Sequence, residues 1–511
     1  MTGEKFIMIC AIVIYLMVMV YIGVKYSKRA KGGAGEFYLG GRQLGPVVSA
    51  MSAEASDMSS WLLMGLPGVA YFCGIADAAW TAIGLGIGTY LNWLIVAKRL
   101  RHYTERIDAI TIPDFFSRRY NDKKNVLSAI AAVIIIVFFV PYTASGFAAV
   151  GKLFSSLFGV DYLTAMIVGA IIIVLYTTLG GFLAVSITDL IQSIIMSVAI
   201  IVVLVFGIKT AGGWANVCEN AKNVAGYLSL TASANIATGE SGKYGFITIC
   251  STLAWGLGYF GMPHILVRFM AVDNADKIKL SRRIASIWVV ISMAAAIVIG
   301  IIGYAMSKNG AIITFGSASE AEAVIVKIAG LLSTYGWGAA AVAGLIIAGI
   351  LASTMSTADS QLLTAASSVS QNLLQEAFGI KLSEKASMLA ARLTVIGVAI
   401  IAVFLAQDPN SSVFSVVSFA WAGFGAAFGP VVLLALFWKR SNKWGALAGM
   451  IAGGAMVFIW KYAVRPLGGA WNIYELLPAF IIGCIAAIVV SLLTAKPDAE
   501  TEKVFEEVKA M

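Results

Sequence analysis

The stretch Ser52-Ala-Glu-Ala-Ser-Asp-Met-Ser-Ser60, followed directly by Trp61-Leu-Leu-Met-Gly-Leu-Pro-Gly68, interrupts an otherwise apolar segment that covers residues 46–71. All of its first nine residues except the methionine are small or polar. Glycine and proline break helices, and serine and aspartate compete for backbone hydrogen bonds. Inside a bilayer, such a stretch is tolerated only where protein or a water-filled cavity satisfies the freed backbone groups. It therefore predicts a broken transmembrane helix that faces a protein interior.

The rest of the chain is strongly apolar. Hydrophobic residues make up 59% of its 511 residues and charged residues 12%, against roughly 25% charged residues in soluble proteins. Apolar segments near the ~20 residues that cross a bilayer divide the chain, and no soluble domain large enough to fold alone remains. We expect an all-α polytopic membrane protein in a lipid bilayer, with about thirteen spans at 6–26, 46–71, 76–97, 126–151, 161–180, 187–208, 244–262, 284–306, 338–371, 390–407, 411–438, 445–463 and 474–494.

The basic residues indicate how the chain is oriented. With the N-terminus outside, the loops assigned to the cytoplasm hold 27 of the 36 Lys and Arg residues, as the positive-inside rule requires. We therefore expect a multi-pass protein of the cytoplasmic membrane with its C-terminus in the cytoplasm, and a first span that is retained rather than cleaved. The same rule explains the net charge of +9, so nucleic acid is not an expected partner.

Composition also argues against several classes of chemistry. The five cysteines lie far apart without a CxxC motif, and there are only two histidines. Neither a disulfide framework nor a zinc or other transition-metal site is expected. The sequence shows no paired acid/base site and no phosphate-binding loop, so it does not predict an enzyme. No feature indicates an organic cofactor or an obligate protein partner.

A second interruption occurs five spans after the first, in Trp255-Gly-Leu-Gly-Tyr-Phe-Gly-Met-Pro263. The two interrupted spans cross the membrane in opposite directions, so spans two to six and seven to eleven form a five-plus-five inverted repeat. Paired broken helices at corresponding positions of inverted repeats indicate the midplane binding site of a secondary transporter. The expected division is 1–45 (first helix and loop), 46–208 (first repeat), 209–438 (second repeat) and 439–511 (last two helices and tail).

A hydroxyl stripe lies on span nine. Ser353, Ser356, Thr357 and Ser360 follow the i, i+3, i+4, i+7 spacing and share one helical face. Such a stripe is typical of close helix packing. The alternative is a sodium site, because hydroxyls and backbone carbonyls supply the oxygen ligands of a hard cation, and the carbonyls of Ala55 and Met58 in the broken span two would be its other half.

Carboxylates inside the membrane are costly and usually functional. For Asp57 and Asp359 we expect a functional role, although Asp57 could also hold the broken helix together. Asp189 is expected near the inner interface, where a solvated or capping role is equally open. Glu54 could face a vestibule or pair with a basic residue. Several aromatic residues lie beside the breaks, where a ring could be sandwiched: Trp61, Trp255, Tyr259 and Phe260, with Tyr142 and Trp421 in the same cluster.

Five runs resemble the sodium/solute symporter family, and in particular its bacterial sodium/proline symporters. The runs are Ser52–Gly68, Phe37–Arg42, Gly180–Ser186, Trp255–Leu266 and Ala420–Pro430, and the resemblance extends from about residue 10 to about 495. It implies sodium-coupled import of L-proline by alternating access, with Na⁺ as the coupling ion. It also implies that sodium binds the backbone oxygens of Ala55, Met58 and Ser353 and the hydroxyls of Ser356 and Thr357, that Asp57 is important for coupling, and that proline contacts Trp61, Tyr142, Trp255, Tyr259 and Pro263.

The sequence departs from this pattern at two positions, since Glu54 and Ser60 stand where glycines are expected. Asp189, Asp359 and Ser360, with Ser356, resemble a second sodium site of some relatives, so the sodium stoichiometry stays open. Two other functions also stay open: a sodium symporter for another solute, such as pantothenate or another amino acid, and a sensor that binds without transporting. Known sensors carry added signalling domains, whereas about seventeen residues follow the last span here, which favours a carrier.

Overall fold

The apolar segments fold as helices, because a helix satisfies its backbone polar groups within the segment, as a bilayer demands. The computed structural model describes residues 3–27, 34–179 and 181–511, and in that part of the chain ten helices are long and apolar enough to cross a membrane. They are α1 (Gly3–Ser27), α5 (Ile75–Leu91) continued by η3 (Asn92–Val96) and α6 (Ala97–Arg106), α8 (Val126–Phe158), α10 (Phe182–Thr210), η5 (Ala275–Lys277) with α14 (Ile278–Lys308), α17 (Trp337–Ser367) with η6 (Ser368–Ala377), α18 (Glu384–Leu405), α19 (Val413–Phe437), α20 (Lys443–Ile459) with η7 (Trp460–Val464) and η8 (Arg465–Leu467), and α21 (Leu476–Leu493).

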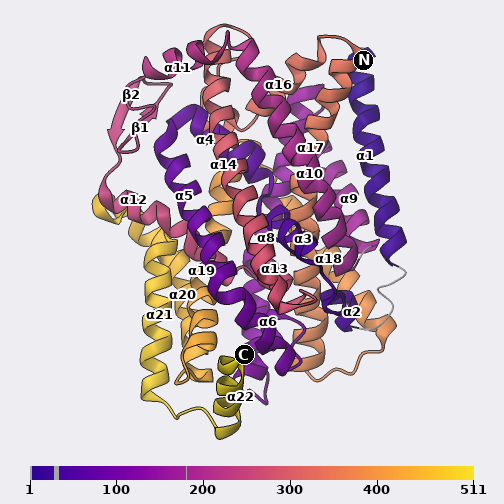
Figure 1. Cartoon of the computed structure of the whole chain (residues 1–511), viewed down its shortest axis with the longest axis vertical. Helices are drawn as coiled ribbons and strands as arrows, with labels where there is room; N and C mark the ends of the chain where they lie inside the picture. The colour runs from indigo at the N-terminus through magenta and orange to yellow at the C-terminus, as the bar shows by residue number, and fades with distance from the viewer. Residues whose placement is uncertain (1–2, 28–33, 180) are drawn as a thin grey trace.

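Shorter elements complete the bundle (Figure 1). Those within or beside it are α3 (Pro46–Asp57), η2 (Trp61–Gly65), α4 (Leu66–Cys73), α9 (Tyr162–Leu179), α12 (Phe246–Leu253), η4 (Ala254–Gly261), α13 (Pro263–Met270) and α16 (Val324–Ser333). Those in the connections are α2 (Ala34–Leu39), η1 (Gly40–Arg42), α7 (Ile112–Arg119), α11 (Trp214–Lys222), the antiparallel hairpin β1 (Ala232–Asn235) and β2 (Glu240–Lys243), α15 (Ala318–Ala321), η9 (Gly469–Trp471) and α22 (Ala499–Ala510).

The all-α fold class is confirmed, and each expected span contains helix. The number of thirteen crossings and the four-part division of the chain stay predictions. Part of the expected basic loop (residues 28–33) and Gly180, the first residue of one recognised motif, lie outside the described residues.

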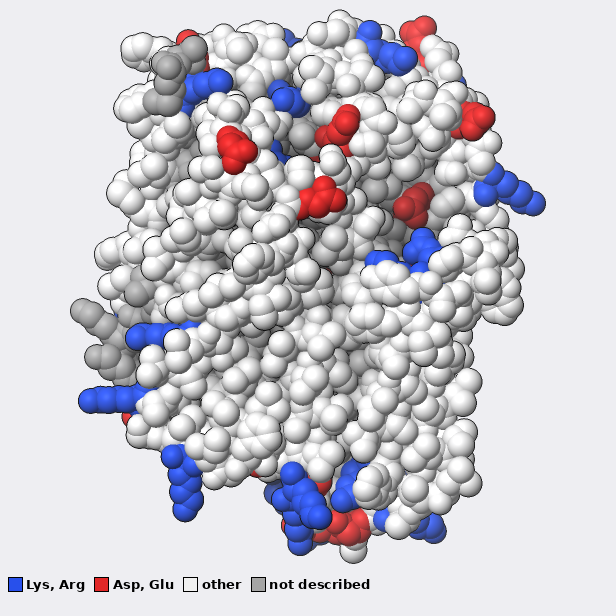
Figure 2. All heavy atoms as spheres, turned by 180° about the vertical axis from the view of Figure 1, so that it is seen from behind, with Lys and Arg blue, Asp and Glu red and all other residues white. Residues whose placement is uncertain are grey.

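The surface has the pattern of a membrane protein. The described N- and C-terminal ends lie at opposite ends of the bundle (Figure 1). Figure 2 shows Lys and Arg side chains gathered at the end that carries the C-terminus, with a broad uncharged band next to it. Large apolar side chains such as Leu175, Ile291 and Phe404 are exposed on the outer helices. Because water would not favour so much exposed apolar surface, the band fits contact with lipid.

The first predicted break is confirmed. Helix α3 ends at Asp57, and Met58 leaves the helical conformation with φ −77° and ψ 65° while its N–H donates to the Glu54 carbonyl at 2.8 Å. Only Met58 and Ser59 are non-helical, and the chain then continues through the π-helical turn η2 into α4. The break is therefore shorter than the polar run that predicts it, because residues 52–57 remain helical.

The second predicted break is confirmed too. After α12 the chain continues as the 3₁₀ helix η4. Met262 is extended (φ −78°, ψ 107°), and α13 begins at Pro263. Proline suits this position because the first helical residue has no partner for its N–H. The glycines of η4 have a packing role: a Cβ atom at Gly258 would clash with the Trp421 indole, and one at Gly261 with the Phe424 carbonyl. They let α19 lie directly against η4.

Candidate cation and substrate site

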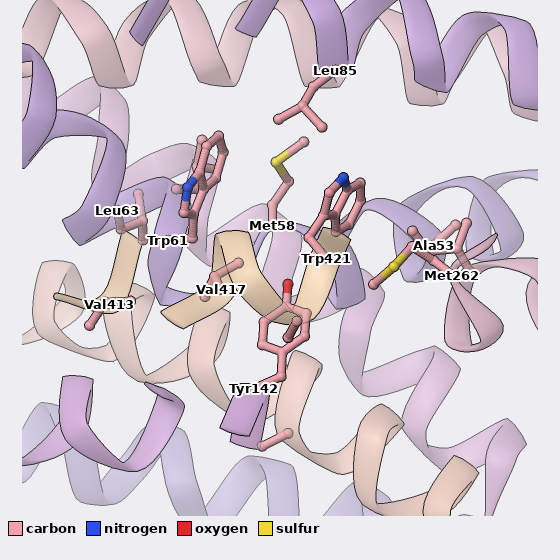
Figure 3. Packing of buried hydrophobic residues seen from close by; sticks show 14 of the residues in the cluster. Ala53, Met58, Trp61, Leu63, Leu85, Tyr142, Met262, Val413, Val417 and Trp421 are labelled. Carbon is pink, nitrogen blue, oxygen red and sulfur yellow. The ribbon is translucent and has the colours of Figure 1, made fainter. Parts of the chain in front are cut away.

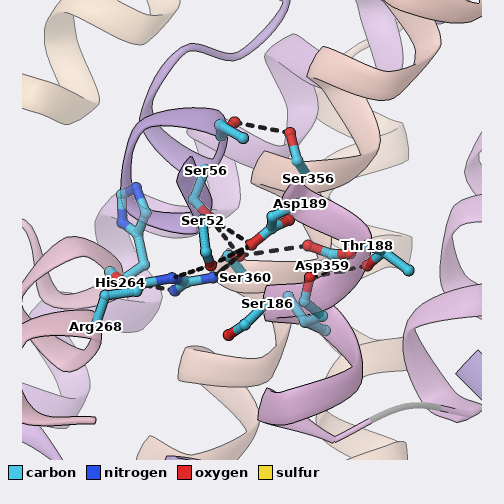
Figure 4. A network of polar contacts seen from close by, with 12 residues as sticks. Ser52, Ser56, Ser186, Thr188, Asp189, His264, Arg268, Ser356, Asp359 and Ser360 are labelled. Carbon is cyan, nitrogen blue, oxygen red and sulfur yellow. Dashed lines mark hydrogen bonds and ion pairs between the residues drawn. The ribbon is translucent and has the colours of Figure 1, made fainter. Parts of the chain in front are cut away.

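The hydroxyl stripe of α17 meets the end of α3 (Figure 4). The Ser356 hydroxyl donates to the Ala55 carbonyl at 2.7 Å and lies 3.2 Å from the Ser353 carbonyl, which the Thr357 hydroxyl also contacts at 3.2 Å. Ala55 is in the last turn of α3, where carbonyls lose their helical partners, so the break exposes its oxygen to α17. The structure thus brings Ala55, Ser353, Ser356 and Thr357 together, all of them buried.

The residues of the first break also line a small apolar hollow of about 10 Å³ (Figure 3). Asp57 connects it to the break: Tyr259 donates a hydrogen bond to the Asp57 carboxylate, and the Tyr142 hydroxyl lies 3.5 Å from the Asp57 carbonyl. The hollow is lined by Asp57, Met58, Trp61, Leu85, Tyr142, Trp255, Val417 and Trp421. It therefore contains three of the expected substrate residues, while Tyr259 contacts its carboxylate.

Aromatic rings close this hollow. The Trp61 and Trp255 rings are 5.7 Å apart. The Phe414 ring stacks on Trp61 at 5.9 Å and lies tilted against Trp255 at 5.5 Å. The Trp421 indole N–H donates to the Trp255 carbonyl at 2.8 Å. Sequence reasoning missed Phe414, because nothing in its neighbourhood marks it as distinct from other apolar residues of a span. Pro263 instead lines a separate small hollow that also contains Arg268 and Ser360.

A second polar cluster lies beside the stripe (Figure 4). Arg268, from α13, forms a buried ion pair with Asp189 at 3.2 Å and donates to Ser360 at 2.5 Å and to Ser52 at 3.1 Å. The Asp189 carboxylate also accepts from Ser52 at 2.6 Å and from Ser56 at 3.2 Å. Asp189 is fully buried, so its solvated or capping role at the interface is wrong.

Arg268 is the main residue that sequence reasoning missed. The expected spans leave it in the loop between residues 262 and 284, yet its side chain is 1% exposed. The signal was available, because Arg268 lies five residues after Pro263, within the apolar helix that follows the second break.

Asp359 adjoins this cluster through Ser360, whose hydroxyl donates to it at 3.3 Å. One oxygen of Asp359 and one of Asp189 have no hydrogen-bond partner in the described part of the chain. A single guanidinium therefore lies beside two buried carboxylates, and it bonds directly to that of Asp189.

Glu54 differs from both of its expected roles. It is 1% exposed, so it faces no vestibule, and no described residue forms a salt bridge with it. Its carboxyl group accepts a hydrogen bond from the Trp93 indole at 3.1 Å. Trp93 packs on Phe269 at a ring distance of 4.3 Å, which makes Glu54 a contact between α3 and the helices around it.

With this geometry established, comparison with known proteins places the chain in a family. The family model described as "Sodium:solute symporter family" matches residues 37–453. The chain belongs to this family. Among relatives of this symporter-family chain, the osmoregulated proline transporter OpuE of Bacillus subtilis is 42% identical over 493 residues, which cover 96% of each chain. The sodium/proline symporter of Staphylococcus aureus (strain JH9) is 40% identical over 505 residues, 98% of this chain and 95% of that protein.

Solved structures support the symporter fold. A substrate-bound, outward-open Na⁺-coupled sialic acid symporter superposes with a TM-score of 0.79 at 19% identity and covers 97% of this chain and 100% of its own. The nucleobase-cation-symport-1 family transporter Mhp1, in a closed conformation, gives a TM-score of 0.52 at 13% identity over 92% of this chain and 98% of its own. The likeness at these identities concerns the fold alone. The family match and the curated relatives show a transporter rather than an enzyme.

Proposed function

We propose that this protein is a sodium-coupled symporter that imports L-proline across the cytoplasmic membrane by alternating access. The observation that carries the proposal is the 2.7 Å contact between the Ser356 hydroxyl and the Ala55 carbonyl, which joins the end of a broken helix to a buried hydroxyl stripe. Family membership supports sodium as the coupling ion. Two relatives that are named as proline transporters support the substrate.

Sodium would bind where α3 and α17 meet. Its proposed ligands are oxygen atoms only, as a hard cation prefers: the backbone oxygens of Ala55, Met58 and Ser353 and the hydroxyls of Ser356 and Thr357. Four of these residues already lie together, and Met58 is the first residue beyond the end of α3. A hydroxyl that now donates to a carbonyl would turn its lone pairs to the ion.

Proline would bind in the apolar hollow. The proposed contacts of its ring are Trp61, Tyr142 and Trp255. Tyr259 would contact both the bound proline and the Asp57 carboxylate. The hollow measures about 10 Å³, far below the roughly 300 Å³ or more of typical ligand pockets, so binding requires the aromatic layer to separate. The place of Pro263 in the pocket stays a prediction, because its present neighbours belong to the Arg268 cluster.

We further propose one sodium ion per proline. The residues that resemble a second sodium site are Asp189, Asp359, Ser360 and Ser356, and the Arg268 guanidinium bonds to the first and third of them. The fixed positive charge of Arg268 supports a structural ion-pair network at these residues rather than a second sodium site. Proline is a zwitterion, so each cycle would carry one positive charge inward. At ~2.3 kcal/mol per charge for ~100 mV, this supports roughly forty-fold accumulation.

The proposed orientation has the N-terminus outside and the C-terminus in the cytoplasm. It is supported by the opposite positions of the two ends and by the gathering of Lys and Arg at the C-terminal end (Figures 1 and 2), since positive residues favour the cytoplasmic side.

Labelled-proline uptake into proteoliposomes, with and without an inward sodium gradient, tests the function. We expect accumulation that depends on sodium and rises with an inside-negative potential. Uptake that ignores sodium would contradict the coupling. Stronger competition by pantothenate or another amino acid than by unlabelled proline would reassign the substrate, and binding without uptake would favour a sensor.

A further inference from the structure

A hollow of about 340 Å³ is lined by residues of α6, of the segment that joins α6 to α8, and of helix α22. These elements meet at the end of the molecule that carries the C-terminus (Figure 1). The hollow is far from the transport site, and basic side chains gather at this end of the surface (Figure 2). The charged residues of its wall are Arg106, Arg118, Arg119 and Lys123 on the positive side and Asp122 and Glu500 on the negative side. We refer to it as the C-terminal hollow.

Arg119 is the unusual member of this wall. Its side chain is 1% exposed, its Nε donates to the Ala435 carbonyl at 2.8 Å, and both terminal nitrogens lack a hydrogen-bond partner in the described part of the chain. The Tyr103 hydroxyl of the same wall also lacks one there. The Arg119 guanidinium packs against the Tyr103 and Tyr120 rings at 5.3 and 5.0 Å, but rings do not replace hydrogen-bond acceptors. Because an unsatisfied buried donor is costly, and more so when it is charged, this group of donors favours an acceptor-rich ligand.

A second observation concerns charge. The Arg119 guanidinium lies 5.3 Å from the centre of the Phe505 ring on α22, and the Arg99 guanidinium lies 5.1 Å from the same ring. Neither arginine forms a salt bridge with any described residue. Two guanidinium groups beside one ring repel each other, and the nearby Glu506 carboxylate offsets part of this charge at Arg99.

The other charges of the wall are already engaged. Arg106 pairs with Glu507 at 2.9 Å, Arg118 pairs with Asp114, and Asp122 accepts from the Leu127 N–H at 2.9 Å. Glu500 would oppose an anion, but it lies beside the N-terminus of α22, whose dipole is positive there. Arg119 and the exposed Lys123 are left to attract a ligand.

We propose that the C-terminal hollow binds a phosphate-type anion. Its oxygens would accept from the Arg119 terminal nitrogens and the Tyr103 hydroxyl, with Lys123 as a countercharge at the rim. The anion could be free phosphate or the phosphate of a lipid headgroup. Phe505 stacks over Arg119, so an anion that reaches the guanidinium shifts this ring, and binding is coupled to the docking of α22.

Inorganic phosphate is the probe. The purified full-length protein in zwitterionic phosphatidylcholine nanodiscs is titrated with phosphate, with chloride at equal ionic strength as reference, and thermal stability is recorded. We expect phosphate to raise the melting temperature saturably. Lys123→Gln should weaken the apparent affinity about tenfold, as expected for loss of one charged partner, whereas Lys385→Gln, an exposed lysine outside the hollow, should not. Phe505→Ala should strengthen it by uncovering Arg119.

Each result of these titrations either supports or overturns the proposed phosphate site. If phosphate has no effect beyond that of chloride, or if Lys123→Gln binds it as tightly as Lys385→Gln does, the site does not exist. If Phe505→Ala binds no more tightly than the parent, the anion does not reach Arg119 and the assignment fails. Repeating the titration in nanodiscs that contain anionic phosphatidylglycerol identifies the source: a weaker apparent phosphate affinity there supports a lipid headgroup, and an equal affinity supports free phosphate. Sodium-driven uptake by each variant shows that it is folded.

Discussion

Replacing Ser356 by alanine should raise the sodium requirement of transport far more than it changes substrate selectivity. The change removes the hydroxyl that lies 2.7 Å from the Ala55 carbonyl and leaves the backbone of both helices in place. An interaction with a charged group contributes about 1.5–3 kcal/mol, which corresponds to roughly a ten- to hundred-fold increase in the sodium concentration for half-maximal uptake. Thr357→Ala should act in the same direction, because its hydroxyl contacts the same Ser353 carbonyl.

Ser353→Ala provides a matched control. Its hydroxyl donates to the Ile350 carbonyl within its own helix at 2.8 Å, and the oxygen that it would offer to sodium belongs to the backbone and survives the change. Labelled-proline uptake is measured in proteoliposomes over a sodium series at fixed ionic strength, together with competition by other amino acids. Equal sodium dependence in Ser356→Ala and Ser353→Ala would refute the assignment. So would a change in amino-acid selectivity without a change in the sodium requirement.

Three further changes test other parts of the site and the fold. Tyr259→Phe removes the donor to the Asp57 carboxylate and should weaken sodium-dependent uptake about tenfold; unchanged uptake kinetics would exclude a coupling role for this contact. Arg268→Gln should reduce the yield of folded protein in size-exclusion chromatography, because a lost partner in a buried ion pair costs about 3–5 kcal/mol. Adding Asp189→Asn should recover part of that yield, and no recovery would mean that the ion pair does not stabilise the fold. Outside the spans, burial and the nearby Glu376 carboxylate raise the pKa of Asp114 from 3.8 to about 6, so its stabilising contribution is present below pH 3.8 and lost as the pH rises through about 6. Asp114→Asn should therefore show a smaller fall in melting temperature between pH 5 and 8 than the parent, and parallel curves would contradict this.

The broken helices and the hydroxyl stripe could be predicted because their causes are local. Proline at the start of α13, the glycines of η4 and the i, i+3, i+4 spacing on α17 act within one or two helical turns of themselves. The prediction was less sharp for α3, where the polar residues Ser52 and Ser56 stay helical. They do so because their hydroxyls bond to the Asp189 carboxylate of another helix, a partner that the local sequence does not reveal.

The missed residues depend on contacts between distant parts of the chain. Arg268 meets Asp189 across 79 positions and Ser360 across 92, so its burial follows from the arrangement of three helices and not from its own neighbours. The local sequence suggests a vestibule or a basic partner for Glu54 for the same reason, because its actual partner, Trp93, comes from the next long helix. Charge counting also failed for Arg268, since the positive-inside rule assumes that each basic residue near a span end lies in the loop.

The first break places the proposed ion and substrate sites within three residues of each other, and this explains how they could be coupled. The Ala55 carbonyl contacts α17, whereas two residues later the Asp57 carboxylate accepts from Tyr259 and the Asp57 carbonyl faces Tyr142. An ion that draws Ala55 and Ser356 together therefore also fixes the orientation of the last turn of α3, and with it the carboxylate that meets the aromatic hollow. Met58 leaves the helical conformation directly after this turn, so the turn is not continued into η2 and α4 as one helix. The helix break would thus connect the proposed ion site to the proposed substrate hollow.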